Sequence, residues 1–193
     1  LTDFHLNPNN LNDWKNYVRG ALLSKLRDIN DEKSISFIAF TGDMIDKGGA
    51  SYRTPDEAFG LFETEVIKPL LAGLSMARDQ FLFIPGNHDM VRNNDDEREE
   101  LGNAAYFKSG DKIAKFMDKA IKNDDFLGMR RVEPYKTFER NYYAGLPKDS
   151  FYSDIFGSAI KYNFGKESVG VCLINSSWRC YGELDKGQLL IGE

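Results

Sequence analysis

Cysteine is scarce in this sequence of 193 residues, and long hydrophobic runs are absent. Two cysteines, Cys172 and Cys180, are too few for the disulfide framework of a small secreted protein. Because Cys172 lies within the apolar run 169–174, we expect it to be a buried free thiol. Apolar stretches such as Phe37 to Phe40 are far shorter than the roughly 20 residues that a membrane span requires. No membrane-bound form is therefore expected.

Basic residues are also fewer than acidic ones. The sequence has 25 Lys and Arg residues and 30 Asp and Glu residues, which give a net charge of −5. Non-specific electrostatic binding of nucleic acid over a broad surface is thus not expected. Local binding through a metal ion remains an alternative. Residues 1–10 show no basic segment followed by an apolar one, so we expect a cytoplasmic protein. The composition, with 41% hydrophobic and 28% charged residues, predicts one globular domain over residues 1–193.

Three short apolar segments, residues 1–6, 34–41 and 81–85, share strand character and end in ionisable residues. Between them, apolar residues repeat at three- and four-residue spacing and predict helices over 11–29 and 54–71. This alternation indicates an α/β fold with a largely parallel sheet covered by helices. The ionisable residues would then meet at the carboxyl edge of the sheet, where such folds bind ligands.

Local signals refine these elements. Asn12 or Asp13 is expected to cap the first helix, and Pro69 is expected to kink or end the second. Further along, residues 159–164 and 168–175 have the pattern of two strands joined by a turn. A second, partly antiparallel sheet is therefore predicted.

Residues 90–158 are too many for a simple connection and are expected to form an insertion with structure of its own. Its stretch 106–156 holds 11 of the 25 aromatic residues. These side chains could form a small core of the insertion, or a lid that offers stacking surfaces to a substrate. Candidates for such stacking are Tyr106, Phe107, Tyr142 and Tyr143.

Residues that suit metal binding follow each of the three strand-like segments. Asp3 and His5 are two residues apart, and in a strand this spacing points a carboxylate and an imidazole to one face. Asp43 follows a buried strand and a glycine, and Asn87 and His88 follow a Pro-Gly turn. Each group alone could be a turn residue or a helix cap. Their joint placement at three strand ends indicates a metal site.

The ordered set Asp3-x-His5, Gly42-Asp43-x-x-Asp46 and Gly86-Asn87-His88-Asp89 resembles the motifs of the calcineurin-like metallophosphoesterase superfamily. The resemblance covers residues 1–89, and a looser likeness extends to 173–178 and 185–192. It implies a sandwich of two mixed β-sheets flanked by helices. The insertion 90–158, which we expect to be helical and rich in aromatic residues, matches nothing in the family pattern.

The resemblance also implies a hydrolase that uses two divalent metal ions, Mn, Fe or Zn. Asp3 and His5 would ligate the first ion, and Asp43 would bridge both. Asn87 would ligate the second ion. Such a pair of cations would acidify a bridging water and neutralise the charge of the phosphate.

The same resemblance implies that His88 is the general acid for the leaving group and that Asp46 orients its imidazole. Asp89 would stabilise the turn or contact the residues that bind the metal. Lys47 stands where protein phosphatases of the family carry an arginine, and it can meet a phosphate as a point charge without the bidentate fork. Arg92 is a second candidate for this contact.

One departure concerns histidine, since His5 and His88 are the only two in the chain. The family supplies further ligands from a lone histidine and a Gly-His-x-His motif. Either the chain stops before these motifs or it is a degenerate member. We expect truncation at both ends, with further domains outside this chain, and one firmly bound ion or a weakly held pair here.

The leading functional hypothesis is a phosphodiesterase that acts on nucleic acid or a nucleotide through a metal-bound hydroxide. The alternatives are a phosphomonoesterase, acting on proteins or small molecules, and a scaffold of the same fold that has lost catalysis. Intact motifs from Asp3 to His88 argue against the scaffold.

Overall fold

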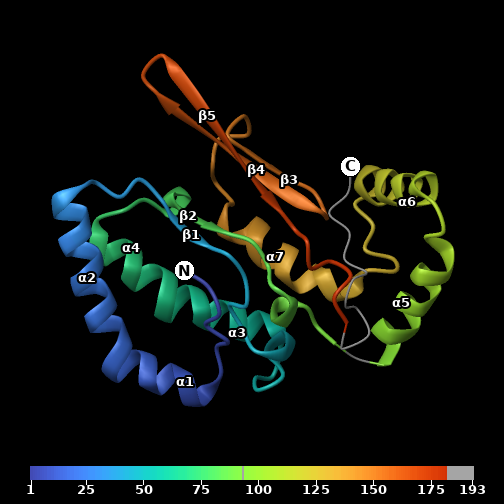
Figure 1. The fold of residues 1–193 in the computed structure, drawn as a ribbon, viewed down its shortest axis with the longest axis horizontal. Coiled ribbons are helices and arrows are strands. Elements are labelled where there is room, and N and C mark those ends of the chain that lie inside the picture. The colour runs from blue at the N-terminus through green and yellow to red at the C-terminus, as the bar shows by residue number, and fades with distance from the viewer. Residues whose placement is uncertain (93, 182–193) are drawn as a thin grey trace.

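The computed structural model describes residues 1–92 and 94–181 and shows a mixed α/β fold with two small sheets (Figure 1). In the first sheet, β1 (Ile38–Phe40) pairs in parallel with β2 (Phe81–Phe83). The second sheet is antiparallel, in the order β3-β4-β5. The predicted parallel pair and antiparallel hairpin are both present, whereas mixed sheets and sandwich packing stay predictions.

The N-terminal segment lies along the outer edge of β1 and the loop that follows it. Backbone N–H groups of Thr41 and His5 donate to the carbonyls of Leu1 and Asp43, both at 2.9 Å. Leu6 alone makes a β-bridge, to Ile45. The prediction of a strand over 1–6 was therefore wrong in detail. Asp3 and His5 both adopt positive φ, at 57° and 49°, because the segment bends between its hydrogen bonds, so strand alternation does not set their direction.

The first predicted helix is present, but it begins earlier and is not uniform. It comprises α1 (Pro8–Asp13), a π-helical stretch (Trp14–Val18) and α2 (Arg19–Glu32). Asn7 is the N-cap, rather than Asn12 or Asp13, because its side-chain oxygen accepts two N–H groups of the first turn and Pro8 follows it.

The second predicted helix comprises α3 (Pro55–Phe62), a π-helical stretch (Glu63–Ile67) and α4 (Lys68–Leu74). Thr54 caps it by accepting the N–H of Glu57 at 3.1 Å. Pro69 does not end the helix, which continues for five more residues. It lies in the first turn of α4, after the π-helical stretch, where the missing N–H is best tolerated.

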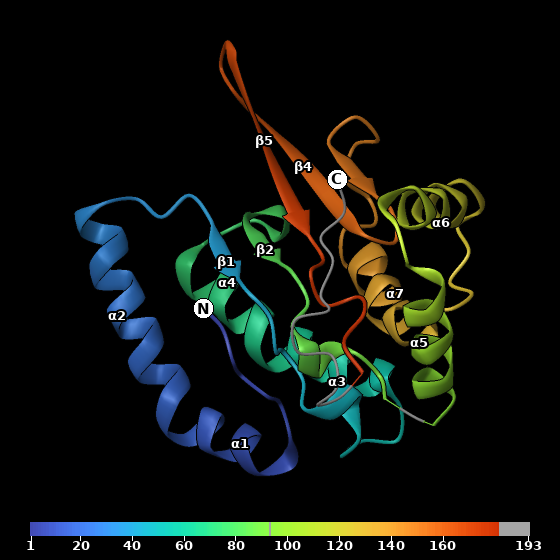
Figure 2. The same cartoon turned by 45° about the vertical axis from the view of Figure 1, so that its right-hand side comes forward.

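The remaining described elements follow β2. They are α5 (Asn94–Tyr106), α6 (Gly110–Asn123), α7 (Glu133–Tyr142), β3 (Phe151–Ser153), β4 (Gly157–Phe164) and β5 (Glu167–Ile174). In both views α5 and α6 lie on the opposite side of the molecule from α2, and the β4–β5 hairpin projects away from the helices (Figures 1 and 2). Among these described elements and those before them, no helix combines the length and the apolar character needed to cross a membrane.

Helix α7 joins the insertion to the first sheet. Hydroxyl groups of Tyr135 and Tyr143 donate to the carbonyls of Phe83 and Phe81, at 3.3 and 2.7 Å. The ring of Tyr143 also stacks on that of Phe83, with centroids 5.3 Å apart. The aromatic side chains of α7 therefore belong to the common core rather than to a separate core of the insertion.

This packing corrects the interpretation of the aromatic residues as a stacking lid. Tyr142 and Tyr143 are each only 2% exposed, so neither can stack on a substrate. Phe107 is partly buried against Phe116 and Trp178. Tyr106 is 48% exposed, but the Lys112 ammonium lies over its ring, 5.1 Å from the centroid.

Cys172 and Cys180 are not joined in a disulfide, but the prediction that Cys172 is buried was wrong. Cys172 is exposed on the same face of β5 as Ile174, which is 49% exposed, whereas Cys180 is 3% exposed. We therefore expect one thiol to react rapidly with an aromatic disulfide reagent in the native protein, and both to react in denaturant. Cys172→Ser should abolish the rapid phase, and rapid labelling of Cys180 would contradict the fold.

Candidate functional site

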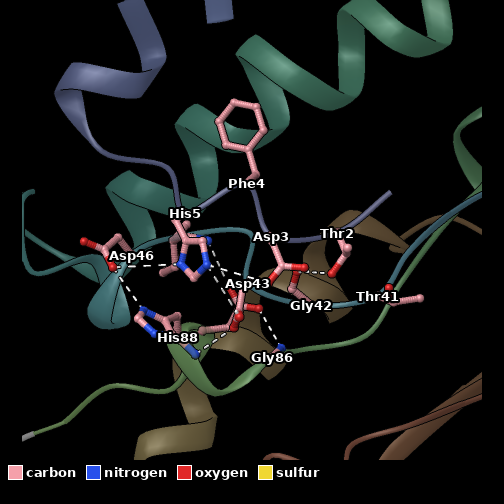
Figure 3. Close-up of polar contacts among 12 residues, drawn as sticks. Thr2, Asp3, Phe4, His5, Thr41, Gly42, Asp43, Asp46, Gly86 and His88 are labelled. Carbon is pink, nitrogen blue, oxygen red and sulfur yellow. Dashed lines mark hydrogen bonds and ion pairs between the residues drawn. The ribbon is translucent and has the colours of Figure 1, made fainter. Parts of the chain in front are cut away.

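Three segments far apart in the sequence meet at the carboxyl edge of the first sheet (Figure 3). They are the N-terminal segment, the loop after β1 and the loop after β2. The two loops touch directly, because the N–H of His88 donates to Asp43 Oδ1 at 2.9 Å. Parallel pairing of β1 with β2 brings their carboxyl ends together, as the sequence predicted.

A first cluster combines Asp3, His5 and Asp43. His5 Nε2 lies 3.8 Å from Asp3 Oδ1 and 3.7 Å from Asp43 Oδ2. The side chain of Asp3 is 61% exposed and that of Asp43 is 14% exposed, so the cluster opens to solvent on the Asp3 side. One imidazole nitrogen and two carboxylate oxygens at this separation can hold a single metal ion.

A second cluster combines His5, Asp46 and His88. His88 Nδ1 lies 3.0 Å from Asp46 Oδ1, and His5 Nδ1 lies 4.0 Å from the same oxygen. The two imidazole rings meet edge to face, with centroids 4.4 Å apart. His5 therefore belongs to both clusters, and one carboxylate oxygen of Asp46 contacts both histidines (Figure 3).

Two glycines allow the loops to approach this closely. Gly42 has φ of 110°, and a Cβ atom there would lie 2.8 Å from Gly86 Cα. A Cβ atom on Gly86 would lie 2.1 Å from Asp43 Oδ1. Any side chain at either position would push the loops apart, which explains why glycine precedes both Asp43 and Asn87.

Asp89 is completely buried behind the two loops. Its Oδ1 accepts the N–H of Ile45 at 2.9 Å, and its Oδ2 accepts the N–H of Gly86 at 2.8 Å. Burial raises the pKa of Asp89 to about 7, and these hydrogen bonds oppose part of the rise. The bond to Gly86 lies within the turn, as expected of a turn-stabilising residue, and the bond to Ile45 crosses to the loop that carries Asp43.

The other candidate residues lie beside the clusters. Asn87 and Lys47 are exposed, on the loops after β2 and β1. Arg92 is partly buried, and its Nη2 donates to the backbone carbonyl of Asn87 at 2.9 Å. The roles assigned to these three residues stay predictions.

The donor set suits a divalent transition metal. Three carboxylates and two imidazoles converge, and no lysine or arginine of the described chain makes an ion pair with Asp3, Asp43 or Asp46. Uncompensated carboxylates favour a bound cation, and mixed nitrogen and oxygen ligands are typical of Mn, Fe or Zn sites rather than of Ca sites.

Comparison with known proteins agrees with this geometry. The model of the calcineurin-like phosphoesterase family matches residues 1–177, which include every element and loop of the site. No curated protein and no solved structure matches the chain.

Proposed function

The chain belongs to the calcineurin-like phosphoesterase family and is a phosphoester hydrolase, and from this premise we propose that it cleaves phosphodiesters in nucleic acid or a nucleotide. The cationic side chains beside the site carry this proposal. Lys47 is exposed on the loop after β1 and offers a point charge without the bidentate fork of an arginine. A phosphodiester brings one negative charge, whereas a monoester brings about 1.5 to 2 near neutral pH. A site that adds so little cationic charge to its metal ions therefore suits the diester better.

We assign the metal ligands from the clusters and the family pattern. Asp3, His5 and Asp43 would hold the first ion, and Asp43 with Asn87 would hold a second ion more weakly. When bound, the divalent cations would acidify the attacking water and offset the charge of the phosphate. Asp43 would be shared, because its Oδ2 faces His5 while its Oδ1 accepts the N–H of His88, on the loop that carries Asn87.

His88 would protonate the leaving-group oxygen. Its Nδ1 is engaged with Asp46 at 3.0 Å, which orients the ring and leaves Nε2 to hold the transferred proton. Lys47 and Arg92 would contact the phosphate. The Arg92 guanidinium is positioned for this by its hydrogen bond to the loop that carries His88.

The proposal is tested by metal content and by substrate preference. After dialysis we expect about one Mn, Fe or Zn ion per chain, and hydrolysis of bis-nitrophenyl phosphate should exceed that of nitrophenyl phosphate. A chelator should abolish hydrolysis, and added Mn²⁺ should restore it. Asp43→Ala should lower both metal content and hydrolysis, whereas Asp28→Ala, on the exposed face of α2, should change neither.

Two results would contradict parts of this proposal. A preference for the monoester would favour the phosphomonoesterase alternative. Metal content unchanged by Asp43→Ala would remove Asp43 from the ligand set.

A further inference from the structure

Asp89 is bonded to both loops that carry the candidate site. Its bond to Gly86 is local, because it closes the short turn Asn87–Asp89. Its bond to Ile45 joins residues 44 positions apart in the sequence and crosses from one loop to the other. Both carboxylate oxygens are therefore occupied, each by one loop.

Each bonded N–H group adjoins candidate site residues. Ile45 directly precedes Asp46 and lies two residues after Asp43, and Gly86 directly precedes Asn87. The loops already touch at Gly42 and Gly86, where no side chain fits between them. The buried carboxylate thus bonds the backbones of both loops close to this contact.

We propose that Asp89 is a positioning residue that sets the separation of the two loops and thereby the affinity of the site for metal. The inference rests on the proposed function. A carboxylate is suited to this task because its two oxygens can accept two backbone donors in a fixed geometry. An amide of the same shape has a single acceptor and would leave one of the two N–H groups facing an NH₂ group.

The test is Asp89→Asn, with Glu139→Gln as the matched control. Glu139 is also buried, on α7, and accepts hydrogen bonds from residues that are not in the site. We expect Mn²⁺ titration to show about 10- to 100-fold weaker binding for Asp89→Asn, the usual effect of losing a group that orients ligands. Glu139→Gln should lower stability and leave the Mn²⁺ dissociation constant within about twofold of wild type.

A second readout needs no metal. Because the chain has two histidines, His5 and His88, their ring nitrogen signals can be followed directly by NMR in the metal-free protein. Asp89→Asn should shift the His88 signals, and Glu139→Gln should not. Unchanged His88 signals together with unchanged Mn²⁺ affinity would overturn the inference and leave Asp89 a purely structural residue.

The outcomes separate this inference from the proposed function. If the wild-type protein binds no metal, the proposed function fails, while a shift of the His88 signals in Asp89→Asn would still support the positioning of the loop.

If Asp89→Asn does not fold, the inference is tested by amide hydrogen exchange in the wild-type protein. Zn²⁺ should slow exchange at the amides of Ile45 and Gly86 together, since coupling between metal and loop contacts is reciprocal. No slowing at either amide would overturn the inference.

Discussion

His88→Ala is expected to lower turnover of phosphoesters with poor leaving groups by roughly 10²- to 10⁴-fold, the usual contribution of a positioned general acid. The ring of His88 is oriented by Asp46 at 3.0 Å, which leaves Nε2 for the leaving oxygen. An alkoxide needs this proton, whereas a nitrophenolate hardly does. Turnover of nitrophenyl diesters should therefore change far less than that of alkyl diesters at equal metal content.

Two comparisons check this assignment. Asp46→Asn keeps the shape of the side chain and should give a smaller loss in the same direction, because the ring is held less well. His5→Ala should lower metal content, whereas His88→Ala should leave it unchanged. Equal losses on both types of ester, or a fall of metal content in His88→Ala, would assign His88 to the metal rather than to the leaving group.

Glu139→Ala is expected to lower the free energy of unfolding by about 3–5 kcal/mol, the range for breaking a buried ion pair. Glu139 is 1% exposed and pairs with Lys136, which is equally buried. Its carboxylate also accepts the hydroxyl groups of Ser153 at 2.8 Å and Ser158 at 2.9 Å. This network ties α7 to β3 and β4, and the loss should appear in urea unfolding followed by circular dichroism.

The expected loss of stability in Glu139→Ala arises from Lys136, which would lose its buried ion-pair partner. Burial lowers the pKa of Lys136, and the Glu139 carboxylate opposes this effect. Without Glu139, the ammonium would be buried and unpaired, so the double variant Glu139→Ala with Lys136→Met should recover much of the loss. The exposed pair of Asp124 and Arg140 is the control, and Asp124→Asn, which suits the positive φ of 48° at this position, should cost less than about 1 kcal/mol. Equal losses at both pairs would contradict the buried network.

Much of the site was predictable because its residues follow strands in sequence. Parallel strands end at one edge, so Asp43 and the Asn87-His88 pair had to be neighbours once β1 and β2 paired. The pairing itself was indicated by alternating apolar strands and periodic helices. The same reasoning failed for Asp3 and His5, which come together although their segment is not a regular strand. Hydrogen bonds to the loop after β1 bend that segment, and such bonds leave no periodic signal in the sequence.

Burial of particular side chains was decided by tertiary partners. An apolar run such as the one around Cys172 is compatible with burial on both faces, but the face of β5 that carries Cys172 and Ile174 is exposed. Tyr142 and Tyr143 lie outside the short motifs that carried the resemblance, and their hydroxyl partners are carbonyls more than 60 residues away. The number of aromatic residues is known from the sequence, but the residues that they pack against are not.

The sequence by itself determined the α/β class, the order of the main elements, the family, and the identity of the polar residues that meet at the sheet edge, because these depend on local periodicity and short motifs. Only the tertiary structure decided that His5 faces both Asp43 and Asp46 and that α7 joins the common core. It alone also showed that Asp89 holds two loops at once. Each of these features depends on atoms from distant segments meeting within hydrogen-bonding or packing distance, which is set by how the whole chain closes around its core.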